Sequence, residues 1–329
     1  MATKSFLFLA AFLSLASACD TLQTRKHAPQ PLPVKVEPGQ PQPVPQTPTQ
    51  GAPNGTEAGM PVVPVQETVP HSGQVLPVGV YLSAGAIRSF AHIGVLRVLQ
   101  RAQVPIVAIG GMEWGSIVAA SYATSRGANE VEWEMMKLRK EELPSTSLLG
   151  HEVTARDTQE LFGFLKNAFG DKDLAGGTVP FRCSTTDGDE TQFISTGKAR
   201  EQLLKCSVLP PMYRFYDRAG KQWVSGAVSP GDWPGELRKA GAQYIIYVDV
   251  VSHGNVLSLN KYPNEQQLRA LWMAVKSISK EQHLFANLTM EIPMDIDLTD
   301  FDRRRDAVAV GERVANTYIN DILHAIGIQ

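Results

Sequence analysis

Cysteine is scarce in this chain, with three among 329 residues, and that excludes a small fold held together by many disulfides. Neither sign of charge dominates, because 31 lysines and arginines stand against 33 aspartates and glutamates. This balance excludes a strongly basic nucleic-acid binder, so we expect no nucleic-acid partner. The sequence also lacks a P-loop, a dinucleotide-binding fingerprint and metal-ligand spacing. We therefore expect neither a cofactor nor a metal ion.

The N-terminus has the features of an export signal. Phe6–Ala16 is an apolar run that is too short to span a bilayer, which takes about 20 residues. With small residues at its end, the run predicts a signal peptide over residues 1–18. The letters LASAC also resemble a bacterial lipobox, although Ala16 stands where lipoboxes usually have leucine. We expect lipidation of Cys19 and a periplasmic or surface lipoprotein of the bacterial cell envelope. The alternative is a soluble exported protein with a free thiol.

Residues 19–76 differ in composition from the rest of the chain. More than half of the 22 prolines lie between Cys19 and Pro77, among Gln, Thr and Gly and with few aromatic residues. Such a segment cannot bury enough apolar surface to offset the entropy that is lost on ordering. It predicts a disordered, proline-rich tether that would let a folded domain stand off a membrane.

Residues 77–327 have the pattern of one folded domain. Short apolar runs with strand character alternate with helical periodicity, and Tyr244–Val251 is almost continuously apolar, as in a parallel strand buried on both faces. Asp187-Gly188 predicts the turn of a hairpin. The alternation favours an α/β domain with a mainly parallel central sheet. Cys183 and Cys206 could pair in an oxidising compartment, but the sequence does not show that they are close.

The most informative segment joins a predicted strand to a predicted helix. Gly111-Met112-Glu113-Trp114-Gly115 has the glycine spacing of the G-x-S-x-G turn, in which a sharp bend projects one side chain above the sheet. The elbow glycines Gly111 and Gly115 leave room for that bend. The projecting residue of such a turn is a nucleophilic serine, and here it is Glu113.

Two longer segments carry a family resemblance. Leu82–Leu96, with the sequence LSAGAIRSFAHIGVL, resembles the signature LSGGGARGFAHIGVL of bacterial patatin-like phospholipases. Gln222–Pro234 resembles the segment around that family's DGG or DGA motif. The resemblance implies a three-layer α/β/α patatin-like domain over residues 77–327, with a mainly parallel central sheet. It also implies hydrolysis of acyl esters by a Ser-Asp dyad.

Both positions of the dyad are substituted in this chain. Matched residue by residue, the nucleophile position is Glu113 and the aspartate position is Ser225. The family's oxyanion loop corresponds to Ala84, Gly85, Ala86 and Arg88. A glutamate has no hydroxyl to activate, and a serine is too weak a base near neutral pH. We expect a degenerate member without the dyad, a pseudoenzyme that binds a lipid or a protein. The alternative is an active phospholipase or esterase with unorthodox catalytic residues.

The Glu113 side chain has an expected place in the turn. Backbone N–H groups at a helix N-terminus favour an anion, and the oxyanion loop would supply further donors. We predict that the Glu113 carboxylate occupies the oxyanion site, with Arg88 as a candidate counter-charge. The alternative is that Glu113 points into solvent. Ser116 lies outside the frame of the turn and His92 lies in the predicted helix of the signature, so we expect structural roles for both.

Overall fold

The computed structural model describes residues 74–125, 127–142, 158–188, 190–214, 216–218, 220–255 and 266–328. The predicted signal peptide, Cys19 and nearly all of the predicted tether lie outside the described residues. None of the described helices combines the length and the apolar character that crossing a membrane requires.

An eight-stranded sheet forms the centre of the domain. Its strands are β1 (Val78–Leu82), β2 (Ile106–Gly111), β3 (Phe181–Asp187), β4 (Glu190–Ile194), β5 (Tyr216–Arg218), β6 (Lys221–Ser225), β7 (Tyr244–Asp249) and β8 (Leu288–Glu291). The order along the sheet is β5-β6-β3-β2-β1-β7-β8, and β4 also pairs with β3. Pairing is parallel from β3 through β2, β1 and β7 to β8, and antiparallel at β4, β5 and β6. The predicted α/β fold with a mainly parallel sheet is therefore confirmed.

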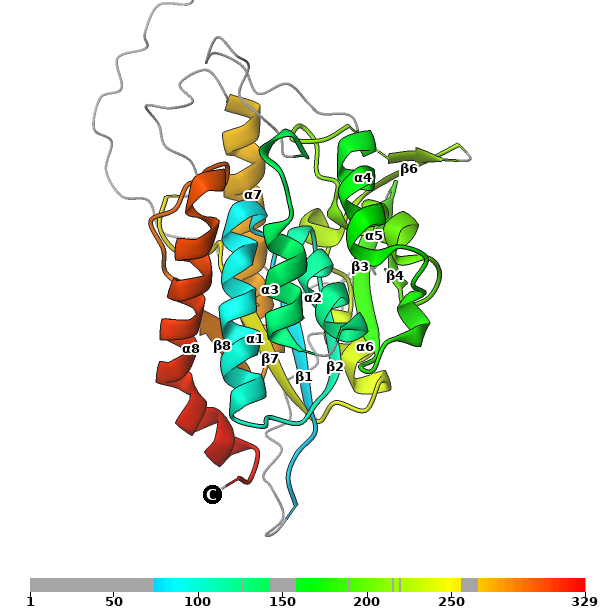
Figure 1. The fold of residues 1–329 in the computed structure, drawn as a ribbon. Coiled ribbons are helices and arrows are strands. Elements are labelled where there is room, and N and C mark those ends of the chain that lie inside the picture. The colour runs from blue at the N-terminus through cyan, green and yellow to red at the C-terminus, as the bar shows by residue number, and fades with distance from the viewer. Residues whose placement is uncertain are drawn as a thin grey trace, which may run out of the picture. The chain divides into compact units, whose positions relative to one another are not determined.

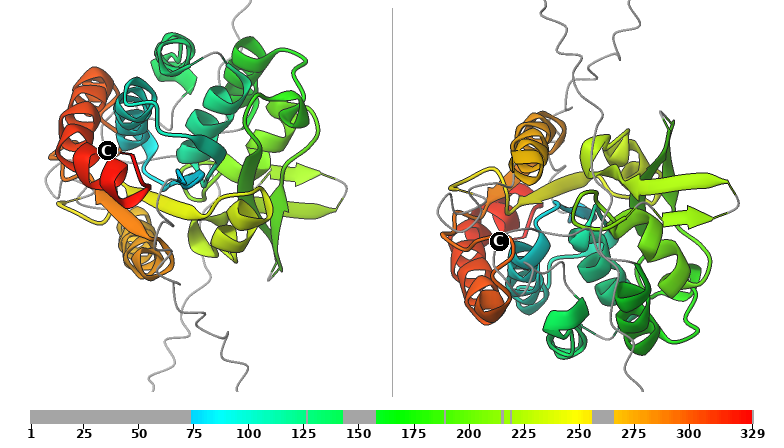
Figure 2. Two further views of the ribbon diagram at one scale, coloured as in Figure 1. Left: turned by 90° about the horizontal axis from the view of Figure 1, so that it is seen from below. Right: turned by 90° about the horizontal axis from the view of Figure 1, so that it is seen from above.

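Helices cover both faces of the sheet (Figures 1 and 2). One face carries α1 (Ala91–Arg101), α2 (Trp114–Thr124), α3 (Ala128–Met136), α4 (Thr158–Phe169), α5 (Ala199–Ser207) and α8 (Arg304–Ala325). The other face carries α6 (Trp233–Lys239) and α7 (Gln266–Gln282). The short 3₁₀ helices are η1 (Ala86–Phe90), η2 (Lys140–Glu142), η3 (Leu174–Gly176), η4 (Gly226–Val228), η5 (His283–Phe285) and η6 (Phe301–Arg303). These are the three layers that the sequence predicts.

The local sequence explains the central strands and one of their ends. Every residue of β1 and β7 is buried, as expected of strands in the middle of a sheet that is covered on both faces. The predicted strand over Tyr244–Val251 ends at Asp249, two residues early. The reason is that Asp249 Oδ1 accepts the N–H groups of Val251 (2.8 Å) and Ser252 (3.0 Å), which turns the chain.

Two further predictions concern β3. The hairpin at Asp187-Gly188 is present, because β3 and β4 pair antiparallel and Gly188 has a positive φ of 62°. A disulfide joins Cys183 of β3 to Cys206 of α5, so the pairing that the sequence left open does occur. It ties the sheet to the helical layer next to α2.

Candidate functional site

Two loops meet at the carboxyl ends of β1 and β2. The two strands are parallel neighbours, and their last residues, Leu82 and Gly111, are paired. Residues 83–85 lead from β1 into η1, while Met112 and Glu113 lead from β2 into α2. The substituted oxyanion loop and the elbow are therefore adjacent, at the sheet edge where α/β proteins commonly place their sites.

The elbow has the strained backbone of a sharp strand-to-helix turn. Glu113 has φ 51° and ψ −130°, a backbone conformation that residues other than glycine rarely adopt. A Cβ at Gly111 would lie 2.7 Å from the Gly115 backbone, and a Cβ at Gly115 would lie 2.4 Å from the Ser83 carbonyl oxygen. Both elbow glycines are thus required by close backbone contacts on either side of Glu113.

The Glu113 carboxyl group lies on the oxyanion loop. Its Oε2 accepts the N–H groups of Gly85 (3.0 Å) and Ala86 (2.9 Å). Its Oε1 has no hydrogen-bond partner among the described residues, and the residue is 1% exposed. Burial raises the pKa of Glu113 to about 7, although the nearby backbone N–H groups of Gly85, Trp114 and Ala86 act in the opposite direction. The predicted placement of the carboxyl group is confirmed, and the solvent-facing alternative is wrong.

The prediction that Arg88 neutralises Glu113 is wrong. The guanidinium donates to three carbonyl oxygens, those of Ile296 (2.6 Å), His253 (3.0 Å) and Asn255 (2.5 Å). Burial lowers the pKa of Arg88 to about 10, while Asp297, Asp295 and Asp249 raise it. Arg88 therefore holds the segments after β7 and β8, and two backbone N–H groups take the place of a counter-ion for Glu113.

Ser225 lies beside the elbow but does not reach the carboxyl group. Its Oγ accepts the backbone N–H of Glu113 (2.8 Å) and that of Ala227 (3.2 Å). The Glu113 N–H also donates to the carbonyl oxygen of Cys206 (3.0 Å). Cys206 is one of the two cysteines of the disulfide. Ser225 thus occupies the expected neighbourhood and stabilises the backbone of the turn.

The oxyanion loop keeps one glycine where a side chain does not fit. A Cβ at Gly85 would lie 2.4 Å from Val250 Cγ2. Ala86 has φ 44°, so of the two alanines in the loop it is the strained one, while Ala84 is simply buried. The loop therefore keeps its N–H donors in place despite the alanine substitutions.

Ser116 and His92 have the structural roles that the sequence predicts. Ser116 Oγ donates to the Glu113 carbonyl oxygen (2.5 Å) in the first turn of α2. His92 Nε2 lies 3.0 Å from the Ser83 carbonyl oxygen, and burial lowers the pKa of His92 to about 4. His92 is therefore neutral near pH 7, and its ring contacts the backbone where the oxyanion loop begins.

The sequence did not point to a polar cluster at the end of β7. Asp249 Oδ2 accepts hydrogen bonds from Ser279 Oγ (2.9 Å) and His283 Nε2 (2.7 Å). Burial alone would raise the pKa of Asp249, but hydrogen bonds from His283, Val251, Ser252 and Ser279 outweigh burial and lower the pKa below its ordinary value. The available signal was an aspartate at the carboxyl end of a buried strand.

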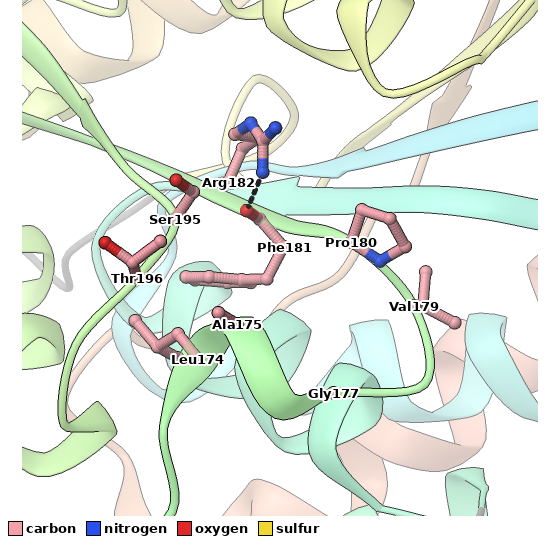
Figure 3. A pocket seen from close by; sticks show the side chains of 9 residues that line it. All are labelled: Leu174, Ala175, Gly177, Val179, Pro180, Phe181, Arg182, Ser195 and Thr196. Atoms are coloured by element: carbon pink, nitrogen blue, oxygen red, sulfur yellow. Dashed lines mark hydrogen bonds between the residues drawn. The ribbon is translucent and has the colours of Figure 1, made fainter.

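A hollow of about 260 Å³ lies at the amino-terminal end of β3 (Figure 3). It is lined by Leu174, Ala175, Gly177, Val179, Pro180, Phe181, Arg182, Ser195 and Thr196. None of these lining residues belongs to the oxyanion loop or to the elbow. No cluster of His, Cys, Asp or Glu within the described residues suits a metal ion.

Comparison with known proteins agrees with this arrangement. Residues 80–231 match the family model of patatin-like phospholipases. The chain is similar to lysophospholipase NTE1 of Coccidioides immitis, at 29% identity over 191 residues. It is also similar to patatin-like phospholipase domain-containing protein 6 of Homo sapiens, at 32% identity over 213 residues. These matches cover 53% and 61% of this chain but only 11% and 15% of the relatives' own length.

Among solved structures, VipD from Legionella pneumophila aligns with a TM-score of 0.45 at 10% identity, over 76% of this chain and 68% of that chain. The family match begins within β1, runs through both loops and continues past Ser225. It therefore includes every residue that surrounds Glu113 in the elbow and the oxyanion loop. The chain contains a domain of the patatin-like phospholipase family.

Proposed function

We propose that this chain is an exported, lipid-anchored patatin-like pseudoenzyme that binds a lipid or a protein and does not hydrolyse acyl esters. The observation that carries the proposal is the Glu113 carboxyl group on the N–H groups of Gly85 and Ala86. Those donors would have to hold the developing oxyanion of an acyl transfer. With a carboxyl group of the chain already there, they are not free for a substrate.

The substituted residues also lack the required chemistry. Glu113 has no hydroxyl to act as an activated nucleophile, and attack by its carboxylate on an ester would give an anhydride, which is an uphill intermediate. Ser225 Oγ already accepts two backbone N–H groups, and a serine hydroxyl is a poor proton acceptor near neutral pH. The fold therefore remains, but the two positions supply neither a nucleophile nor a base for acyl-ester hydrolysis.

Separate observations support the proposed location. Cys19 after a signal-like segment favours lipidation, and the proline-rich tether would give the domain reach from a membrane. The disulfide between Cys183 and Cys206 supports folding in an oxidising compartment such as the bacterial periplasm. The membrane, reached through lipidated Cys19, is thus the first partner in the proposal.

An active lipid acyl hydrolase is the second candidate, because relatives bear the name lysophospholipase. One experiment separates the two. Purified protein is incubated with a chromogenic fatty-acyl ester and with a lysophospholipid, beside the variants Glu113→Ala and Glu281→Ala. Glu281 is an exposed residue of α7 and serves as the matched control. We expect no hydrolysis above the blank. Hydrolysis that is lost in Glu113→Ala and retained in Glu281→Ala would refute the pseudoenzyme proposal.

A further inference from the structure

Four acidic and imidazole side chains form a line from the interior to the surface. His283 Nε2 lies 2.7 Å from Asp249 Oδ2, and His283 Nδ1 lies 4.0 Å from Glu291 Oε1. Glu291 Oε2 in turn contacts His253 Nε2. The side chains of Asp249, His283, Glu291 and His253 are 0%, 22%, 37% and 47% exposed, so protons from solvent can reach the line at its outer end. We call these four side chains the acid–base line.

The acid–base line is tied to the turn formed by residues 250–255. Asp249 Oδ1 accepts two N–H groups at the start of the turn, and His253 belongs to both the turn and the line. Lys276 Nζ donates to the Gly254 carbonyl oxygen (2.8 Å). Arg88 donates to the carbonyl oxygens of His253 and Asn255. The position of the turn therefore depends on groups from η1, β7, β8 and α7.

The same turn supports the oxyanion loop. The Val250 N–H donates to Ser83 Oγ (3.1 Å), and Val250 Cγ2 fills the space where Gly85 would carry a Cβ. Arg88, whose guanidinium holds the turn, follows Ala86 by two residues in η1. A shift of the turn would thus move the backbone N–H groups that hold Glu113.

The charged groups around the line fix the direction of a pH effect. Arg88 and Lys276 face the carbonyl oxygens of the turn, and both are cations at any pH between 5 and 8. Asp295 and Asp297 raise the pKa of Arg88 by their negative charge. The Tyr247 ring lies 6.0 Å from the His283 ring.

Imidazole is the side chain that ordinarily changes charge near neutral pH. When either histidine gains a proton, the cation faces Asp249 or Glu291, and the contact becomes an ion pair.

We propose that the acid–base line is a proton-sensitive latch, which holds the turn at residues 250–255, and through it the oxyanion loop, more tightly in acid than at pH 8. Protonation adds attraction at both imidazoles, because each histidine lies next to a carboxylate. The latch does not depend on whether the domain hydrolyses esters.

Hydrogen exchange of the full-length protein tests the latch. The measurements use the Glu113→Gln background, so that the carboxyl group of Glu113 does not titrate. Protection factors of peptides covering residues 83–90 and 249–255 are compared at pH 5.5 and pH 8, corrected for the intrinsic exchange rate. We expect protection to be about fivefold higher at pH 5.5, the size of effect that a partly exposed ion pair produces.

Two variants and a control decide the outcome. His253→Gln removes the outer, exposed end of the line, and Glu291→Gln removes the carboxylate between the two imidazoles. Each should bring the ratio of protection close to one. His324→Gln, at an exposed position in the last turn of α8, should leave the ratio unchanged. A ratio that is equal in all three variants, or protection that is higher at pH 8, would overturn the proposal.

Discussion

At the scale of single residues, Glu113 combines two opposing features. Two backbone N–H groups hold Oε2, yet Oε1 is buried and has no partner among the described residues. A charge on this carboxyl group is stabilised by the first feature and destabilised by the second. Since the pKa is raised to about 7, burial is the larger effect. The turn is therefore most stable with Glu113 neutral.

The stability of the protein should record this preference as a dependence on pH. Because the folded-state pKa of about 7 lies above the ordinary value of 4.5, the stability from Glu113 is complete below pH 4.5 and declines as the pH rises through 7. The glutamine in Glu113→Gln does not titrate. The free energy of unfolding of this variant, relative to that of the wild type, should therefore increase by about 3 kcal/mol from pH 4.5 to pH 8.

Urea unfolding at several pH values measures the difference between the two proteins. The exposed control Glu281→Gln should keep a constant difference from the wild type over the whole range. If the curves of Glu113→Gln and the wild type run parallel, Glu113 ionises as it would in water, and the raised pKa is wrong.

The dyad positions make a second prediction at the same scale. Ser225 Oγ lies 2.8 Å from the Glu113 backbone nitrogen, so a carboxylate at residue 225 would stand next to a hydroxyl at residue 113. We expect Glu113→Ser alone to be inert towards a chromogenic acyl ester, because Ser225 cannot take the proton. Glu113→Ser combined with Ser225→Asp should exceed it by on the order of 100-fold.

The single variant Ser225→Asp, which keeps the carboxyl group on the loop, serves as the control and should also be inert. Equal activity in Glu113→Ser and in the double variant would show that residue 225 is not the aspartate position.

At the scale of elements, α1 and α8 touch through their backbones. A Cβ at Gly94 would lie 2.1 Å from the Val308 carbonyl oxygen, and a Cβ at Gly311 would lie 2.0 Å from the Ala91 carbonyl oxygen. An alanine at either position forces the helices apart and disturbs η1, which precedes α1. Gly94→Ala and Gly311→Ala should each lower the free energy of unfolding by about 1–3 kcal/mol.

A third glycine separates packing from helix propensity. Gly163 lies inside α4, and a Cβ there would meet nothing within 4 Å. Gly163→Ala should therefore raise the free energy of unfolding by up to about 1 kcal/mol. Denaturant melts of the three variants check the prediction, and a loss of stability in all three would show that the helix contact is not the cause.

Predictability from the sequence depended on how local each signal was. The hairpin at Asp187-Gly188 and the buried strand β7 were predictable because turn chemistry and apolar runs act over a few residues. The elbow at Glu113 was predictable from glycine spacing and from the family signature. The partners of Arg88 were not, since Ile296 lies 208 residues away, and no local pattern encodes such a pairing. The contact between Asp249 and His283 of η5 was not predictable either, because the two residues lie 34 positions apart.

At the scale of the whole molecule, the disulfide and the N-terminal sequence are two independent arguments for the proposed export to an oxidising compartment. A disulfide between buried cysteines fits an oxidising environment, and an export signal would deliver the chain there. The described domain has no helix suited to crossing a membrane.

The anchor prediction concerns Cys19, the residue that follows the predicted signal peptide. Cys19→Ala removes the thiol that would carry the lipid, so we expect the variant to move from the membrane fraction to the soluble fraction after a high-salt wash. The control Thr21→Ala changes a nearby tether residue and keeps Cys19, so it should stay with the membranes. The salt wash matters because charge-based association is screened by salt while insertion of acyl chains is not. Membrane retention of washed Cys19→Ala would place the anchor elsewhere in the chain.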